Sequence, residues 1–286
     1  MTLVMPHIVE KSFHDWAQGR GFLEGLGPRY VFRGHGEGAW TLSTSIERCC
    51  QHPSAAEVEP LLRAAFQSAC HLYEIRLPER DDPISWLALM QHHRVPTRLI
   101  DWTQSPHVAA YFAAVHEGPS ASDYSIWAID ILKLKRAALE QFARNQNRLG
   151  YELSFGRSSR FAESLFNNQI RCVAPVQAAH FNVRQTNQKG LFLCVGDLGA
   201  SFVDNLAAMA DLFQGDLGFK IVLPGSSRAE ALQDLYTLNV QPATLFPGLD
   251  GFCDSMRLRL RLLQENVGQL QWEVEFRDVL REVGFM

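Results

Sequence analysis

The sequence predicts an α+β fold, in which a mixed, mainly antiparallel central sheet is flanked by helices in one compact domain. Candidate strands and helices alternate irregularly, whereas a doubly wound sheet would need a regular strand–helix repeat. The 286 residues, 47% of them hydrophobic and 20% charged, suffice for a large core. We find no linker that forces a boundary, so residues 1–286 are taken as one domain, with the motifs in about 28–253 and a helical extension at 254–286.

The first third of the chain contains four candidate elements. Residues 12–18 are typical of a short helix with Ser12 as its cap, and residues 30–34 of a strand that enters a glycine-rich turn. Apolar residues at helical spacing predict a helix over 57–77, and a second helix follows over 83–91.

The middle of the chain begins with a clear helix start. Ser105 is a good N-cap and Pro106 suits the first helical position, so we expect a helix to about His116. Strong β-formers predict a strand over 124–129, and residues 133–147 have a helical pattern.

The last third contains the remaining candidate elements. Pro175 cannot donate to a ladder, so a strand at 171–176 would lie at an edge or an end of the sheet. The other expected elements are strands at 190–195 and 219–223 and helices at 201–213, at 226–238 with Ser226 as cap, and at 254–265.

Charge is distributed unevenly along the chain. The net charge of −4 gives no overall signal for nucleic-acid binding. Residues 133–184, however, contain nine basic and three acidic side chains, a net charge of +6. This segment is either a solvated helix face or a surface that meets phosphates.

Several classes of protein are excluded by simple patterns. The six cysteines include no Cys-x-x-Cys pair and suggest reduced thiols. No apolar run approaches the ~18 residues of a membrane span, and residues 1–10 lack a signal-peptide pattern. No His or Cys pair has metal-ligand spacing. We therefore expect a cytoplasmic protein with no metal and no membrane partner.

A dense polar cluster lies between an apolar run at 87–90 and the helix expected from Ser105. Its members are Gln91, His92, His93, Arg94, Thr97, Arg98, Asp101, Trp102 and Thr103. Buried polar groups must pair with each other or with a ligand, and a helix N-terminus nearby offers free N–H groups. Either Arg98 and Asp101 form a buried ion pair under Trp102, or the cluster lines a nucleotide cleft.

Two further segments carry candidate binding groups. Arg33 follows Phe32 at a strand end and precedes Gly34, where a guanidinium could meet a phosphate, a carboxylate or a carboxamide, or could tie down the turn through an aspartate. A run of amides at 182–188 precedes a buried strand; Arg184 and Gln188 either face a ligand or belong to a polar turn.

Catalytic signatures of common hydrolases are missing from the sequence. There is no Gly-x-Ser-x-Gly elbow, and no cysteine has a recognisable nucleophile context. The carboxylates Glu37, Asp101 and Glu163 have no spacing that identifies a glycoside hydrolase pair.

Taken together, these blocks resemble the FRG domain, a bacterial and phage family named for a Phe/Tyr-Arg-Gly motif. The matching pieces are residues 32–34, the block 91–103 with Ser105-Pro106, the stretch 184–192 and the stretch 245–251. Val95 stands where the family usually has glycine.

The same order of motifs is more distantly similar to ADP-ribosyltransferases, which implies NAD as substrate and a role as a toxin or phage-defence effector, with an antitoxin as one kind of partner. The resemblance implies that Arg33 holds the nicotinamide ribose or a phosphate, that Arg98 binds the pyrophosphate, and that Gln188 or Asp101 orients the ribose or the acceptor. The other implied binding positions are Gly34, His92, Thr97, Trp102, Thr103 and Arg184.

One position departs from the transferase pattern. Gln188 stands where these enzymes carry a glutamate, and an amide stabilises an oxocarbenium charge less than a carboxylate does. Asp101 or Glu163 would then have to supply the charge. Two other classes remain open: a nucleic-acid-binding or nucleolytic protein that uses 133–184, and a non-catalytic interaction domain.

Overall fold

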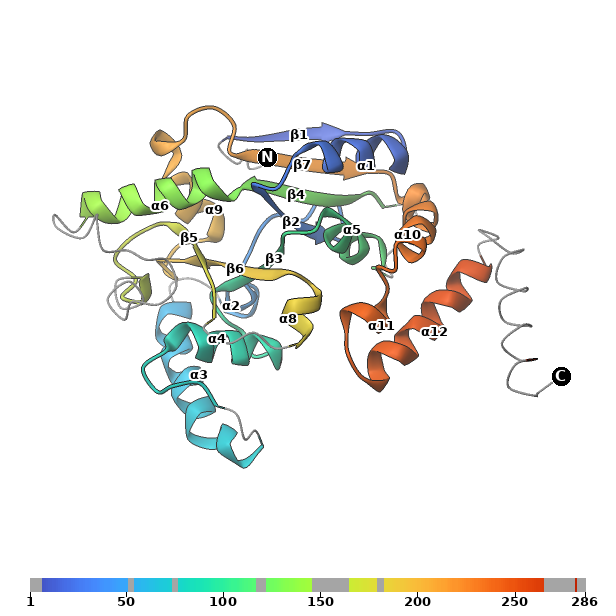
Figure 1. The fold of residues 1–286 in the computed structure, drawn as a ribbon. Helices are drawn as coiled ribbons and strands as arrows, with labels where there is room; N and C mark the ends of the chain where they lie inside the picture. The colour runs from blue at the N-terminus through green and yellow to red at the C-terminus, as the bar shows by residue number, and fades with distance from the viewer. Residues whose placement is uncertain are drawn as a thin grey trace.

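The computed structural model describes residues 7–50, 54–73, 77–116, 122–145, 165–178, 183–264 and 281 of the chain. Within them lies a seven-stranded sheet in the order β1-β7-β4-β2-β3-β6-β5 (Figure 1). β1 and β7 are parallel and every other neighbouring pair is antiparallel, which confirms the predicted α+β class. The strands are β1 (Ile8–Ser12), β2 (Tyr30–His35), β3 (Leu99–Thr103), β4 (Tyr124–Asp130), β5 (Val173–Val176), β6 (Gly190–Val195) and β7 (Gly218–Leu223).

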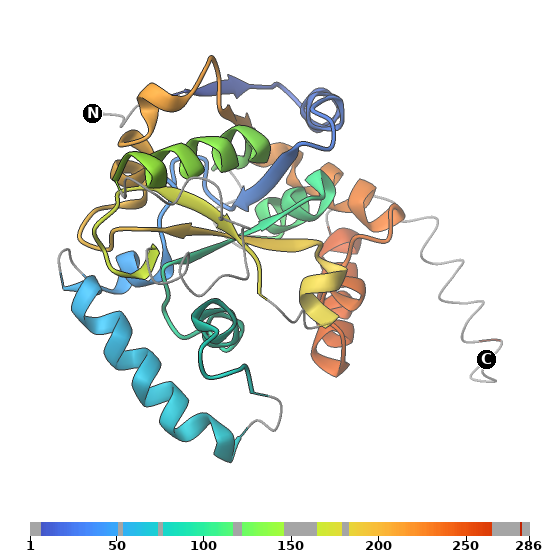
Figure 2. The same cartoon turned by 60° about the vertical axis from the view of Figure 1, so that its left-hand side comes forward.

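Helices cover both faces of the sheet, and each face has its own hydrophobic core. One core receives side chains from α1 (Trp16–Gly25), α5 (Pro106–Ala114), α10 (Arg228–Thr237) and α12 (Leu249–Gln264). The other core receives side chains from α2 (Ser45–Cys49), α3 (Ala55–Ala69), α4 (Pro83–His92), α6 (Ile131–Asn145) and α9 (Phe202–Ala207). Figures 1 and 2 show α3 projecting from the body of the protein beside α4.

Short helices complete the fold. They are α8 (Val183–Asn187), α11 (Pro242–Leu245) and the 3-10 turns Cys70–Leu72, Ala210–Leu212 and Gly225–Ser227. Among the described residues, no helix combines the length and the hydropathy that a bilayer crossing requires.

Most expected elements are present, and several boundaries differ. Ser12 ends β1 and Asp15 caps α1 instead, because the Asp15 carboxylate accepts a hydrogen bond from the Gln18 N–H at 2.8 Å. Ser226 is not a helix cap, since α10 begins at Arg228 after a 3-10 turn. α3 and α9 end earlier than expected, and α12 begins at Leu249, ahead of the predicted start.

The sequence did not predict β1, α2, α8, α11 or β3. Of these, β3 positions the central polar cluster. All five of its residues pair with β6, but only Thr103 pairs with β2, opposite Phe32. β2 and β3 are both central in the sheet, so their separation beyond this pair opens a gap in the middle of the sheet. A large pocket in the described part of the protein lies there.

Candidate functional site

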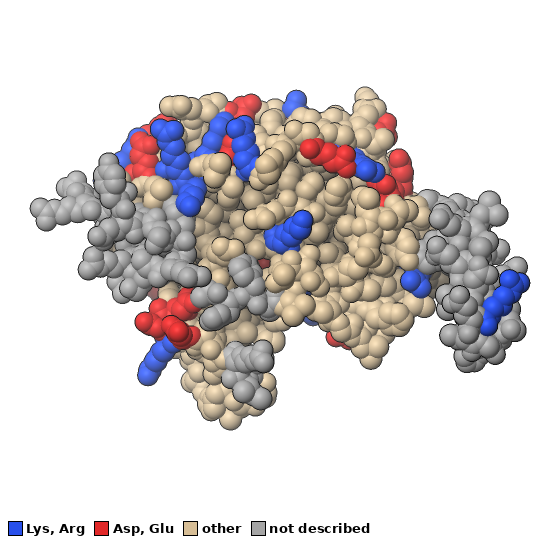
Figure 3. All heavy atoms as spheres, in the orientation of Figure 1, with Lys and Arg blue, Asp and Glu red and all other residues tan. Residues whose placement is uncertain are grey.

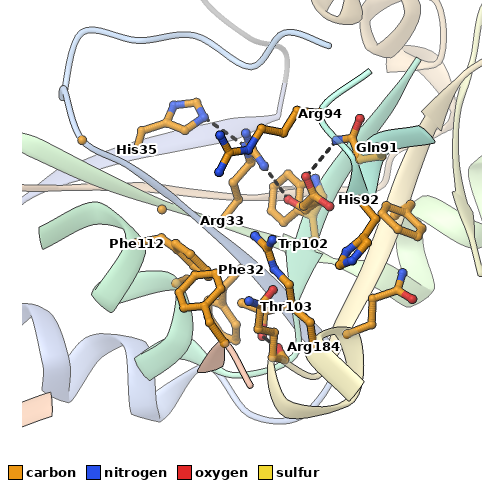
Figure 4. Close-up of a pocket in the computed structure, with 18 of the residues that line it drawn as sticks. Phe32, Arg33, His35, Gln91, His92, Arg94, Trp102, Thr103, Phe112 and Arg184 are labelled. Carbon is orange, nitrogen blue, oxygen red and sulfur yellow. Dashed lines mark hydrogen bonds between the residues drawn. The ribbon is translucent and has the colours of Figure 1, made fainter. Parts of the chain in front are cut away.

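The pocket is a cavity of about 1440 Å³ at the divergence of β2 and β3. Its walls come from β2, α4, β3, α5, α8 and the start of α12 (Figure 4). Eight expected site residues line it: Arg33, Gly34, His92, Asp101, Trp102, Thr103, Arg184 and Gln188. Segments up to 155 residues apart in sequence thus meet in one cavity, whereas Thr97 and Arg98 are not among its lining residues.

The three residues of the Phe-Arg-Gly motif have different structural tasks. Phe32 is buried in the core beneath α5. Gly34 faces the same side, and a Cβ there would overlap the backbone of Ala109 and Ala113 in α5. Arg33 points to the opposite face, as alternation along a strand requires, and enters the pocket (Figure 4). Gly34 therefore allows α5 to pack closely on β2, in addition to lining the pocket.

Arg33 is held by two neighbours that leave its charge unpaired. Its Nη1 donates to the backbone carbonyl oxygen of Asp101 at 2.6 Å, and its Nε donates to Nε2 of His35 at 3.1 Å. Burial lowers the pKa of Arg33, while the Asp101 carboxylate opposes this shift and Arg48 adds to it. The guanidinium is therefore desolvated and has no carboxylate bonded to it.

His35 is an electrically neutral support for Arg33. Burial lowers the pKa of His35 to about 3, and the positive charge of Arg33 contributes. Its Nδ1 lies 3.2 Å from the indole N–H of Trp127 and its Nε2 faces Arg33. A neutral imidazole accepts at only one nitrogen, so one of these two N–H donors lacks an acceptor at any instant.

Four guanidinium groups line the pocket without an ion pair among the described residues. They belong to Arg33, Arg48, Arg94 and Arg184. Burial also lowers the pKa of Arg184, against an opposing effect of Asp101 and with a contribution from Arg94. Elsewhere, arginines such as Arg20 and Arg171 are paired with aspartates. The pocket thus brings together four arginines that have no ion pair among the described residues.

Asp101 supplies an exposed carboxylate between these arginines. Its Oδ2 accepts a hydrogen bond from Gln91 Nε2 at 2.8 Å, and its charge acts on both Arg33 and Arg184. Two more aspartates, Asp250 and Asp254, line the side of the pocket formed by α12. The Glu37 carboxylate oxygen Oε1 lies 3.7 Å from Nε2 of His116. Glu163 is outside the described residues.

Arg98 does not pair with Asp101, and its position does not fit the expected pyrophosphate contact. The side chain is 1% exposed, and its Nε lies 2.6 Å from a carboxylate oxygen of Glu59 on α3. Its Nη1 donates to the carbonyl oxygen of Leu165 at 3.1 Å, and the guanidinium stacks on Phe166. Arg98 is thus a buried brace between α3 and the sheet.

Thr97 is likewise buried beneath the pocket floor. Its hydroxyl donates to Gln91 Oε1 at 2.7 Å, and its backbone N–H donates to the Ser45 hydroxyl. Because Gln91 also donates to Asp101, Thr97 acts on the site through that amide. It holds the amide in the orientation that presents its Nε2 to the carboxylate.

Gln188 joins two walls of the pocket. The side-chain Nε2 of Gln188 donates to the backbone carbonyl oxygen of Leu245 at 3.2 Å. The backbone carbonyl oxygen of Gln188 accepts a hydrogen bond from the Thr103 hydroxyl at 2.6 Å. The neighbouring Asn187 donates to the carbonyl oxygen of Thr244 at 2.9 Å. The amide run therefore fastens α8 to α11 and to the end of β3.

Aromatic side chains form much of the remaining lining. Phe112 and Phe246 meet edge to face with ring centroids 6.0 Å apart, and the Arg184 guanidinium lies 4.6 Å from the Phe246 ring. The indole N–H of Trp102 is buried and has no hydrogen-bond partner in the part of the chain that the structure describes. An unpaired buried donor at a cavity is the kind of group that a ligand oxygen satisfies.

Several lining residues were missed from the sequence. Arg48, Arg94, Trp40, Phe112, His116 and Phe246 come from five different segments. Phe246 does lie in a stretch that resembles the FRG domain, and Arg94 in the central polar cluster, so a signal existed for these two. For the other four residues, Trp40, Arg48, Phe112 and His116, the sequence contained no pattern that indicated a place in the site.

The described part of the basic segment 133–184 is not a continuous basic surface. Arg144 is paired with Asp211 and Glu140, and Arg171 with Asp197. Figure 3 shows acidic side chains among the basic ones over α6. Residues 146–164 of the segment, which include three of its arginines, lie outside the described residues.

Comparison with known protein families adds one finding. Residues 28–122 match the family model of the FRG domain, a stretch that includes β2, α2, α3, α4, β3 and α5. Residues 28–122 are thus identified as an FRG domain. Neither a curated protein nor a solved structure matches it. The FRG-domain match includes Arg33, Arg94 and Asp101, but it ends before Arg184 and Phe246, which complete the pocket.

Proposed function

We propose that the FRG-domain protein binds NAD in the pocket at Arg33 and transfers ADP-ribose from it. The observation that carries the proposal is the group of four guanidinium ions that line one cavity without an ion pair among the described residues. Burial desolvates two of them, Arg33 and Arg184. Arginines bind phosphate oxygens strongly, because the guanidinium fork can donate two parallel hydrogen bonds.

The size and the lining of the cavity suit a dinucleotide. Its volume of about 1440 Å³ is larger than a typical small-molecule pocket of about 300–1,000 Å³. Phe112, Phe246 and the Arg184–Phe246 stack offer flat surfaces for a base or a nicotinamide ring. The unpaired indole N–H of Trp102 offers a donor for a ligand oxygen.

The transfer step breaks the bond between C1′ of the nicotinamide ribose and the ring nitrogen. Nicotinamide leaves with the bonding electrons, and the electron pair of an acceptor forms the new bond to C1′ as the acceptor loses a proton. Positive charge develops on the ribose in between, and a carboxylate is the group that stabilises it best. Asp101 is the carboxylate whose charge acts on Arg33 and Arg184, whereas the Gln188 amide donates to the carbonyl oxygen of Leu245.

The test measures NAD binding by calorimetry, together with nicotinamide release and label transfer in a cell lysate. We expect wild type to bind NAD, Arg33→Ala to bind it at least tenfold more weakly, and Asp101→Asn to bind it but to release far less nicotinamide. Arg144→Ala, which removes a surface arginine of α6, is the matched control and should behave as wild type. The absence of NAD binding in wild type would overturn the proposal.

A further inference from the structure

Arg94 occupies a backbone position that suits glycine. It follows α4, with a φ of 65°. The N–H of Val95 bonds to the carbonyl oxygen of Met90 at 2.9 Å, and the N–H of Arg94 bonds to that of Gln91 at 3.0 Å. This pair of bonds is the Schellman motif, in which the left-handed residue is usually glycine because a Cβ is unfavourable there.

The same motif recurs at the end of α10 with a more tolerant residue. Asn239 has a φ of 60°, its N–H bonds to the carbonyl oxygen of Tyr236, and the N–H of Val240 bonds to that of Leu235. Asparagine enters the left-handed region more readily than most residues. Arginine has no such preference, so its presence at the end of α4 needs another reason.

Stabilisation of the helix end does not provide that reason. A cation near a helix C-terminus is favourable, but any position in the last turn supplies it with an ordinary backbone. The Arg94 side chain forms no hydrogen bond or ion pair within the described residues. It enters the pocket instead and is an electrostatic neighbour of Arg184 (Figure 4). Two like charges there add to the backbone cost.

Arg48 and Arg33 form a second pair of like-charged neighbours in the same pocket. The Asp101 carboxylate acts on both Arg33 and Arg184. Four guanidinium groups therefore contribute positive charge to one cavity.

We propose that Arg94 acts with the other three arginines that line the cavity, Arg33, Arg48 and Arg184, to bind two adjacent phosphates of one ligand, so the site selects a diphosphate over a monophosphate. This inference rests on the proposed function for the identity of the full ligand, but the diphosphate preference is tested without NAD. The unfavourable backbone of Arg94 is retained because it directs a guanidinium to the second phosphate.

The test compares inorganic pyrophosphate with orthophosphate at equal ionic strength, by thermal shift and by calorimetry. We expect pyrophosphate to bind wild type at least tenfold more tightly. Arg94→Gly should raise the Tm of the free protein by a few degrees and reduce pyrophosphate affinity at least tenfold. Asn239→Gly, the control at the other Schellman motif, relieves the same backbone but also loses the hydrogen bond that Asn239 Oδ1 accepts from Gln241 Nε2 at 3.0 Å, and it should leave the affinity unchanged.

Three outcomes would overturn the inference: equal affinity for the two anions, an Arg94→Gly variant that keeps the pyrophosphate affinity, or one that melts at a lower temperature than wild type. Arg94→Lys keeps both the charge and the left-handed backbone, and should lie between wild type and Arg94→Gly in affinity at an unchanged Tm. A protein that binds pyrophosphate but not NAD would support the diphosphate site and overturn the proposed transferase.

Discussion

The Nη1 atom of Arg33 lies 2.6 Å from the backbone carbonyl oxygen of Asp101. The two residues belong to neighbouring strands that have already stopped pairing, since β2 and β3 meet only at Phe32 and Thr103. The guanidinium thus bonds across the gap in the sheet and remains exposed to the pocket. One arginine therefore both spans the cleft and contributes to its positive charge.

The buried ion pair of Arg98 and Glu59 leads to a prediction about stability. Glu59→Ala leaves a guanidinium buried without its carboxylate, and we expect a loss of about 3–5 kcal/mol in the free energy of unfolding. The double variant Arg98→Met with Glu59→Leu removes both charges and should be more stable than Glu59→Ala. Urea denaturation measures both, and a double variant less stable than the single one would contradict the prediction.

The same pair illustrates why part of the site could not be predicted. Glu59 lies 39 residues before Arg98, on the helix α3, and many other acids stood nearer in sequence. Asp101 was the natural partner by proximity, but it lies on a strand whose side chains alternate between faces, three positions beyond Arg98. β3 itself was missed because its five residues are interrupted by a charge and follow a polar run.

Other parts of the site could be predicted because local rules decide them. Phe32 and Arg33 alternate along a strand, so one had to be buried if the other faced a ligand. Ser105 and Pro106 begin α5 as expected. The divergence of β2 from β3, which creates the pocket, depends on long-range packing and has no local signal.

Gln188 allows a prediction that separates structural from catalytic roles. Gln188→Glu places a carboxylate against the carbonyl oxygen of Leu245, where the amide now donates. We expect the contact between α8 and α11 to open, with a loss of about 1 kcal/mol in stability and weaker NAD binding. Asn187→Ala, which loses the neighbouring bond without adding charge, is the control. A rise in nicotinamide release in Gln188→Glu would instead assign Gln188 to a catalytic position.

His35 predicts how stability depends on pH. Its pKa of about 3 in the folded protein is below the value of about 6.5 for an unfolded chain, because burial and Arg33 disfavour the charged ring. Between these values the unfolded state binds a proton that the folded state does not. Stability should therefore fall as the pH falls from 6.5 towards 3, by about 2 kcal/mol at pH 5.

The His35 contribution is isolated by a variant that cannot titrate. His35→Asn keeps polar atoms near Arg33 and Trp127 but lacks the ring, so its stability should fall less between pH 6.5 and 5 than that of wild type. Chemical denaturation at a series of pH values measures the difference. Parallel curves for the two proteins would show that another group causes the acid sensitivity.

Trp102 provides the cleanest separation of binding from folding. Its indole N–H is buried and unpaired, and Trp102→Phe removes that donor while an aromatic ring still fills most of the space. Loss of an unsatisfied donor offsets part of the cost of the smaller ring, so we expect a loss of stability below about 2 kcal/mol. Ligand affinity should fall about tenfold, because a ligand oxygen loses its partner.

The control for Trp102→Phe is Trp86→Phe. The indole N–H of Trp86 donates to the Glu79 carbonyl oxygen away from the pocket, so this variant should lose stability but not ligand affinity. Unchanged affinity in Trp102→Phe would mean that no ligand oxygen reaches this N–H.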